Sequence, residues 1–192
     1  MKPVMSEKAW VESIVRLVGE TLRAKDSSLL LSCGTKLSYA HEIREYPENK
    51  PGSAHTAKYE TDLLIREEYG ASVWKPRVVI EAKLGSVTTH DAITYSEKAS
   101  THKKVHPYLR YGIFIGGRKR YPLPGRLFRH GAYFDFMLSW VALEPSSSEM
   151  EMFLNLLLEE VEASRNLEEI LYTSRSPKKK RYTLLHKPLK LE

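Results

Sequence analysis

The chain has very little cysteine and no long uncharged apolar run. Cys33 is its only cysteine in 192 residues, which excludes an internal disulfide framework and a zinc site built from cysteines. No segment has the uncharged length that a membrane-spanning helix needs, and the first residues carry no apolar run of signal-peptide length. We therefore expect a cytoplasmic, intracellular protein that does not associate with membranes.

Acidic residues are outnumbered by basic ones. The chain has 30 Lys and Arg against 24 Asp and Glu, a formal net charge of +6. This excess favours a polyanionic partner, above all nucleic acid. The basic residues crowd the Gly- and Pro-rich segment 116–130 and the C-terminal tail. We expect nucleic acid to be bound in that segment by Arg118, Lys119, Arg120 and Arg126.

The length fits one domain, which we place at residues 1–172, with a basic tail at 173–192. Apolar periodicity predicts alternating helices and strands, so we expect an α/β (α+β) domain with a sheet flanked by helices. The polar segment 34–58 is predicted to be a long loop. The predicted helices are 6–25, 89–104 and 149–165, with one or two further turns at 167–172. The predicted strands are 29–33, 59–66, 77–84, 111–115 and 132–138, and the alternative for 29–33 is a continuation of the helical layer.

Two of these strands carry charges where apolar residues are expected. Asp62 lies in the first, and Glu81 and Lys83 lie in the second. Charge inside an apolar strand destabilises the fold unless it is paired or holds a metal. Side chains alternate between the two faces of a strand, so Glu81 and Lys83 share a face. A hairpin turning near residues 71–72 places Asp62 opposite Glu81, and Glu60 opposite Lys83.

These charges predict a specific chemistry. Two converging carboxylates repel each other unless a cation lies between them, and oxygen ligands select Mg²⁺, with Mn²⁺ as a substitute. The carbonyl of Ala82 would add a third ligand to Asp62 and Glu81. Lys83 would orient or deprotonate a water, or stabilise charge on a phosphate. We therefore expect metal-dependent hydrolysis of phosphodiester bonds.

Asp62, followed after residues 63–80 by Glu81-Ala82-Lys83, resembles the motif of the PD-(D/E)xK nuclease superfamily. The resemblance covers roughly residues 6–138 as an order of elements, although Thr61 stands where many members have proline. It implies a restriction-endonuclease-like core, a central mixed sheet flanked by helices, and Mg²⁺-dependent cleavage of DNA. A type II restriction-like enzyme is the first expectation within this superfamily.

The resemblance also implies an acidic residue from the first helix. Of its three glutamates, Glu7 lies on the apolar face, whereas Glu12 points toward solvent and Glu20 lies at an edge. We expect Glu7 to assist catalysis. The alternative is that Glu7 only complements the positive end of the helix dipole.

The helix after the motif presents Tyr95 and Lys98 on one face. The resemblance implies that such a helix adds a polar residue that contacts phosphate or metal. We expect both side chains to contact nucleic acid, and the alternative is an ordinary solvated helix face. His102 and His106 have helical spacing but lack the partners of a zinc site, so we expect a surface or DNA-facing pair.

The leading hypothesis is an endonuclease that acts on double-stranded DNA as a homodimer, because a two-fold axis matches the symmetry of a duplex. Three alternatives remain open. One is a structure-specific nuclease, for Holliday junctions or repair. The second is a nucleic-acid-binding module that has the nuclease fold without catalysis. The third is an ion-pair ladder in which Glu60 and Asp62 pair with Lys83 and serve stability alone.

Overall fold

The computed structural model describes residues 5–70, 72–119 and 123–173. These residues form a mixed five-stranded sheet in the order β1-β4-β5-β6-β7 and a separate two-stranded ribbon, β2-β3. The strands are β1 Leu29–Ser32, β2 Thr35–Ile43, β3 Ala54–Thr61, β4 Leu63–Glu68, β5 Trp74–Leu84, β6 Arg110–Gly116 and β7 Phe136–Ser139. The helices are α1 Glu7–Lys25, the short 3₁₀ helix η1 Pro47–Asn49, α2 Thr89–Val105, α3 Gly125–His130 and α4 Ser147–Tyr172.

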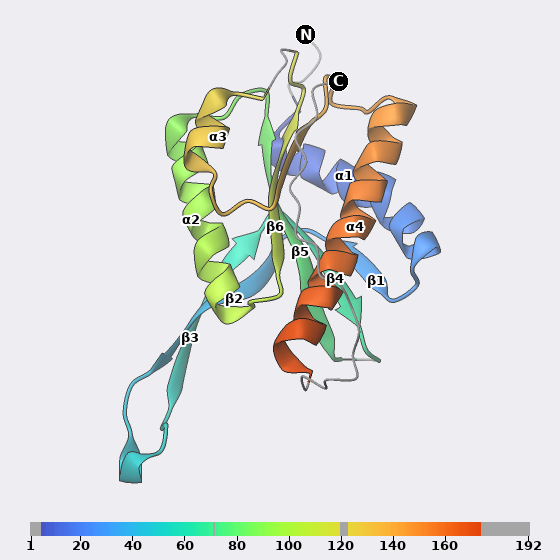
Figure 1. Ribbon diagram of the computed structural model, residues 1–192. Helices are drawn as coiled ribbons and strands as arrows, with labels where there is room; N and C mark the ends of the chain where they lie inside the picture. The colour runs from blue at the N-terminus through green and yellow to red at the C-terminus, as the bar shows by residue number, and fades with distance from the viewer. Residues whose placement is uncertain (1–4, 71, 120–122, 174–192) are drawn as a thin grey trace.

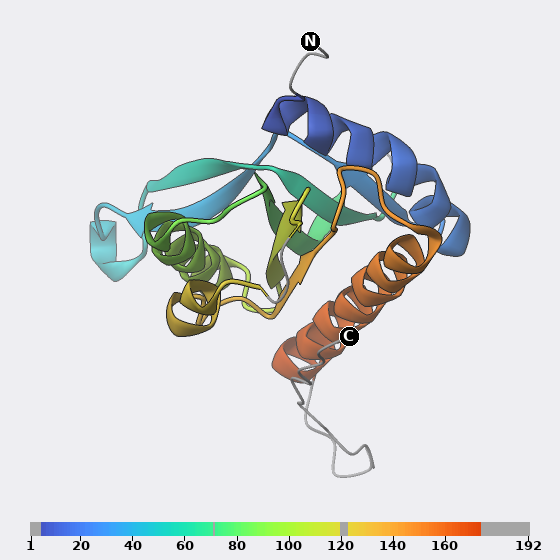
Figure 2. The same cartoon turned by 90° about the horizontal axis from the view of Figure 1, so that it is seen from above.

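The helices form two layers, one on each face of the sheet. Helices α1 and α4 lie on one face, and α2 and α3 lie on the other (Figures 1 and 2). A buried apolar cluster fills each interface, one around Trp10, Phe114 and Trp140 and the other around Leu64, Val79 and Ile113. The predicted mixed α/β class, with helices flanking a mixed sheet, is therefore confirmed. No helix in the described part of the chain has the length and apolarity to cross a membrane.

The predicted register of the central hairpin is confirmed where its strands pair. Leu63 lies opposite Ile80 and Ile65 opposite Val78, and a bulge shifts the register after Ile65. The apolar side chains of this register belong to the cluster under α1 and α4. Alternation then turns Val79 and Glu81 toward α2. Strand β6 pairs with β5 in the parallel direction, as a crossover through a helix requires.

The predicted loop at 34–58 is wrong, because β2 and β3 form an antiparallel ribbon there. The ribbon projects away from the body (Figure 1) and pairs Thr35 with Thr61 and Ile43 with Ala54. Its outer half is exposed on both faces, so apolar alternation, the usual signal of a strand, is missing. Glu60 lies in this ribbon opposite Lys36, so its predicted place opposite Lys83 is also wrong.

Several predicted boundaries also differ from the structure. The first helix begins as expected, with the Ser6 hydroxyl accepting a hydrogen bond from the Ala9 N–H. The strand predicted at 132–138 is shorter, at Phe136–Ser139, because a turn closed by the Phe134 N–H to the Gly131 carbonyl precedes it. The Gly- and Pro-rich segment 116–130 ends in the helix α3. The last helix continues to Tyr172, and the predicted basic tail lies, beyond Thr173, outside the described residues.

Candidate active site

Asp62, Glu81 and Lys83 come together at the carboxyl end of β5. Asp62 occupies the bend between β3 and β4, and its Oδ2 accepts a hydrogen bond of 2.8 Å from the Ala82 N–H. Ala82 stands between Glu81 and Lys83 in the chain, so this bond holds the aspartate beside both. The N–H and C=O of a strand residue point to the same side, and the Ala82 carbonyl therefore faces the edge where Asp62 lies.

Glu81 is a buried carboxylate with two partners. Its exposed fraction is 1%. Lys98 Nζ lies 3.2 Å from each carboxylate oxygen, and the Tyr111 hydroxyl donates to Oε1. Burial raises the pKa of Glu81 and the charge of Asp62 raises it further, whereas Lys98 and Tyr111 oppose the rise. A negative charge at this position is therefore costly, and additional positive charge beside it would be stabilising.

Lys83 is held as a cation. Its Nζ lies 3.3 Å from Glu7 Oε1 and 5.2 Å from the centre of the Tyr95 ring. Burial acts to lower the pKa of Lys83, but its interactions with Tyr95 and Glu7 outweigh burial and raise that pKa above the usual lysine value. Lys83 therefore keeps its proton at neutral pH. This arrangement suits charge stabilisation on a phosphate better than removal of a proton from water.

Glu7 joins the group from the first turn of α1. Besides the contact with Lys83, its Oε2 lies 3.3 Å from the Leu84 N–H. These two contacts tie the start of α1 to the end of β5. Glu7 is thus the acid of the first helix that reaches the predicted site.

The helix residues predicted to lie near the site also reach it. Lys98 contacts Glu81, and its Nζ lies 5.1 Å from the Tyr95 ring centre and 5.7 Å from that of Tyr59. An ordinary solvated helix face is therefore wrong for Tyr95 and Lys98. Tyr59 and Tyr111 were not predicted, because their positions depend on the ribbon and on the parallel pairing of β6.

His102 of α2 and His106, which caps the C-terminus of this helix, do not form a surface pair. His102 is fully buried, its Nδ1 lies 3.1 Å from the Ser38 carbonyl, and its ring lies against that of Tyr111. Burial lowers the pKa of His102 to about 4 and also lowers that of His106. The expectation of a surface pair was wrong because the base of the ribbon, at Ser38, covers this side of α2. The sequence predicted a loop in place of the ribbon, so this cover was not expected.

The donor atoms at the site fit a hard divalent ion in their chemistry. Asp62 and Glu81 supply carboxylates from adjoining backbone positions, and Ala82 supplies a carbonyl. The ammonium group of Lys98 neutralises Glu81 in this structure, so a metal ion bound to the Glu81 carboxylate would take the place of that ammonium group. Among the described residues, no group of three or more His, Cys, Asp or Glu side chains is placed to hold a metal ion. A site here therefore depends on the backbone carbonyl and on water as further ligands.

Of the four basic residues in segment 116–130 that are predicted to bind nucleic acid, three lie near this end of the sheet. Arg118, Lys119 and Arg126 line a pocket beside the loop that follows β5, whereas Arg120 lies outside the described residues. The chain matches no protein-family model and no curated protein. The assignment of a function therefore rests on the geometry of the site and on the sequence motif.

Proposed function

We propose that the protein is a metal-dependent DNA endonuclease with a restriction-endonuclease-like core. The observation that supports this best is the bond from Ala82 to Asp62, which gathers two carboxylates and a protonated lysine at one strand end. A buried glutamate with a raised pKa beside a second carboxylate is expected where a cation is to be bound. The proposal places the enzyme inside the cell, acting on double-stranded DNA as a homodimer of the type II restriction kind.

In this proposal Asp62, Glu81 and the Ala82 carbonyl hold Mg²⁺, with Mn²⁺ as a substitute. The ion would make a bound water more acidic and draw charge from the phosphate oxygens. Lys83, kept cationic by Glu7 and Tyr95, would contact a non-bridging oxygen of the scissile phosphate and stabilise the charge that develops there. Glu7 acts by positioning Lys83, and Lys98 neutralises Glu81 until the ion binds.

The test is a cleavage assay on supercoiled plasmid and on a branched DNA, with Mg²⁺, with Mn²⁺ or with chelator. Asp62→Asn keeps an oxygen that accepts from Ala82, and Lys83→Gln removes the positive charge but keeps a polar, slightly shorter side chain, so both should fold. We expect metal-dependent cleavage that falls at least about 100-fold in each variant. Glu60→Gln is the matched control, because Glu60 lies in the ribbon two positions before Asp62, and it should cleave as the wild type does. Cleavage that persists in Asp62→Asn would refute the proposed site.

A second candidate function is nucleic-acid binding without catalysis. The ion pair between Lys98 and Glu81 favours it, because the lysine already supplies the positive charge that Glu81 needs. DNA binding without cleavage under every metal condition would establish this alternative. Cleavage of the branched DNA alone would instead favour a structure-specific enzyme, for Holliday junctions or repair.

A further inference from the structure

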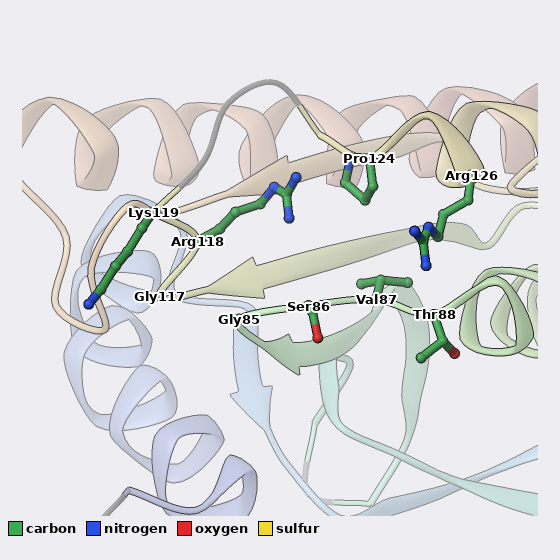
Figure 3. Close-up of a pocket in the computed structure, with 9 residues that line it drawn as sticks. All are labelled: Gly85, Ser86, Val87, Thr88, Gly117, Arg118, Lys119, Pro124 and Arg126. Atoms are coloured by element: carbon green, nitrogen blue, oxygen red, sulfur yellow. The ribbon is translucent and has the colours of Figure 1, made fainter.

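A pocket of about 470 Å³ opens between two loops at the carboxyl ends of β5 and β6 (Figure 3). It is lined by residues 85–88 and 117–119, together with Pro124 and Arg126. A volume of this size is within the range of pockets that bind small molecules or parts of larger ligands. None of these residues belongs to the group around Asp62 and Glu81, so the pocket is a separate feature.

The pocket nevertheless adjoins the candidate active site through the backbone. Its floor, residues 85–88, joins β5, which carries Glu81 and Lys83, to α2, which carries Lys98. Two residues of extended chain cover at most about 7 Å, so the Cα atom of Gly85 lies within that distance of the Cα atom of Lys83. A ligand that extends past Lys83 along the end of β5 therefore meets this pocket next.

The lining is strongly basic. Its described residues include Arg118, Lys119 and Arg126, and none of them carries a carboxylate. The side chain of Arg118 extends toward Pro124 and that of Arg126 toward Val87, whereas Lys119 extends away from both (Figure 3). Like charges gathered in this way repel each other, and a bound anion would relieve the repulsion. Two guanidinium groups are well suited to phosphate, because their N–H groups can bind two oxygens at once.

The backbone around the pocket is fixed by hydrogen bonds rather than left loose. The Gly85 N–H donates to the Gly116 carbonyl at 2.7 Å, and the Arg118 N–H donates to the Trp140 carbonyl at 2.9 Å. Gly85 and Gly117 have φ values of +69° and +66°, which glycine adopts without strain. The two loops are therefore held at a set separation.

The start of α2 adds little to anion binding. Thr88 caps this helix, and its hydroxyl is engaged with the Asp91 carboxylate. The positive end of the helix dipole thus already faces a negative charge. The attraction for an anion comes from the arginines, with the Ser86 hydroxyl beside them in the lining.

We propose that this pocket binds a backbone phosphate of the DNA strand, next to the phosphate that lies at Lys83. The inference rests on the proposed function and names a second contact on the same strand. A DNA strand carries a phosphate about every 3.4 Å along the duplex axis, so a strand positioned at Lys83 brings further phosphates to the pocket mouth. The described residues of the lining include no aromatic side chain, and their guanidinium groups suit the phosphate backbone, whose contacts carry no sequence information directly.

The first test measures binding of a labelled duplex by fluorescence anisotropy in the presence of chelator, so that catalysis plays no part. Arg126→Gln and Arg118→Gln should each weaken binding about 3- to 10-fold and reduce the slope of log K against log salt by about 1. Arg129→Gln is the matched control, because Arg129 is an exposed arginine of the same helix, α3, that does not line the pocket. An equal loss in the control would overturn the pocket as a defined site.

The second test locates the phosphate. In duplexes that each carry one neutral methylphosphonate, substitution at the contacted position should weaken wild-type binding and should cost Arg126→Gln nothing further. Independent, additive losses at every position would overturn the proposal. Inorganic phosphate and a nucleoside monophosphate serve as competitors. We expect neither to compete at concentrations near the Kd of the duplex, and strong competition by the mononucleotide would assign the pocket to a free nucleotide instead.

The outcome also separates this inference from the proposed function. If a methylphosphonate weakens DNA binding by the wild type and by Asp62→Asn but not by Arg126→Gln, while the wild type does not cleave DNA, the phosphate site stands and the endonuclease fails. If the wild type cleaves in a metal-dependent way and Arg126→Gln binds and cleaves normally, the endonuclease stands and the phosphate site fails.

Discussion

Removal of Lys98 should destabilise the fold through Glu81. In Lys98→Met the stem of the side chain is preserved, but Glu81 loses the ammonium group that lies 3.2 Å from both its oxygens. Removing one partner of a buried ion pair costs about 3–5 kcal/mol. Tyr111 continues to donate to Glu81, and the Lys98 side chain is 23% exposed. We therefore expect a loss near the lower end, about 3 kcal/mol at pH 8.

The pH dependence of this loss identifies its cause. Because the folded pKa of Glu81 is raised, its contribution to stability is complete below the unfolded pKa of about 4.3 and is lost as the pH rises through the folded pKa. Lys98 limits that loss, since it acts to lower the pKa of Glu81. The destabilisation caused by Lys98→Met should therefore shrink as the pH falls from 8 toward 4.5.

Urea denaturation followed by tryptophan fluorescence measures this effect, because Trp10 and Trp140 are buried. The background variant Glu81→Gln is the control, and on it Lys98→Met should cost less than about 1 kcal/mol, since no buried charge is left unpaired. A cost that is the same at pH 8 and pH 5, or the same with and without the glutamate, would refute the reasoning.

Three further predictions concern other parts of the fold. Arg165→Leu should cost about 2–3 kcal/mol at pH 7, because Arg165 bonds both Asp26 and Glu67. A hydrogen bond from Ser28 lowers the pKa of Asp26. Burial acts to raise the pKa of Glu67, but its hydrogen bond from Arg165 contributes to a net lowering. The stability that these carboxylates give is present above their unfolded pKa values and is lost on acidification, so the cost of Arg165→Leu in denaturation experiments should shrink below about pH 4. His102 should stay neutral down to about pH 5 in an NMR titration, since burial lowers its pKa to about 4. The fold should lose stability as the pH falls below about 6.5, because the unfolded chain then binds a proton at this histidine and the folded chain does not. Titration of His102 near pH 6.5 would contradict its burial. Gly116→Ala should cost at least about 2 kcal/mol, because a Cβ there would lie 2.1 Å from the Trp10 ring, whereas the same change at Gly19, where nothing lies within 4 Å, should stabilise α1 by up to about 1 kcal/mol in thermal melts.

Local patterns were enough to predict the centre of the fold. The alternation of apolar side chains defined β4 and β5, and the short connection between them set a register in which Leu63 faces Ile80. The charges at Asp62, Glu81 and Lys83 were informative because each departs from that alternation. Helical periodicity placed Glu7 on the apolar side of the first helix, and this was enough to predict that Glu7, among the glutamates of α1, is the one beside the end of β5.

The remaining features depend on contacts that local patterns do not encode. Tyr111 meets Glu81 only because β6 pairs in parallel with β5, and the register of a parallel pair is not set by a turn. The ribbon escaped prediction because a two-stranded element exposed on both faces needs no apolar alternation. His102 was placed on the surface for the same reason, since the base of that ribbon, at Ser38, is what covers it.

The ribbon makes the surface around the candidate site asymmetric. Strand β3 alone is about 25 Å long, and it leaves the sheet at Asp62, so that this length of chain extends from the site to one side only (Figure 1). A linear polymer that lies across the site would meet the ribbon in one orientation and open solvent in the opposite one. The two ways of laying the same strand on this surface would therefore differ in energy, so that a single protomer would distinguish the two ends of such a polymer.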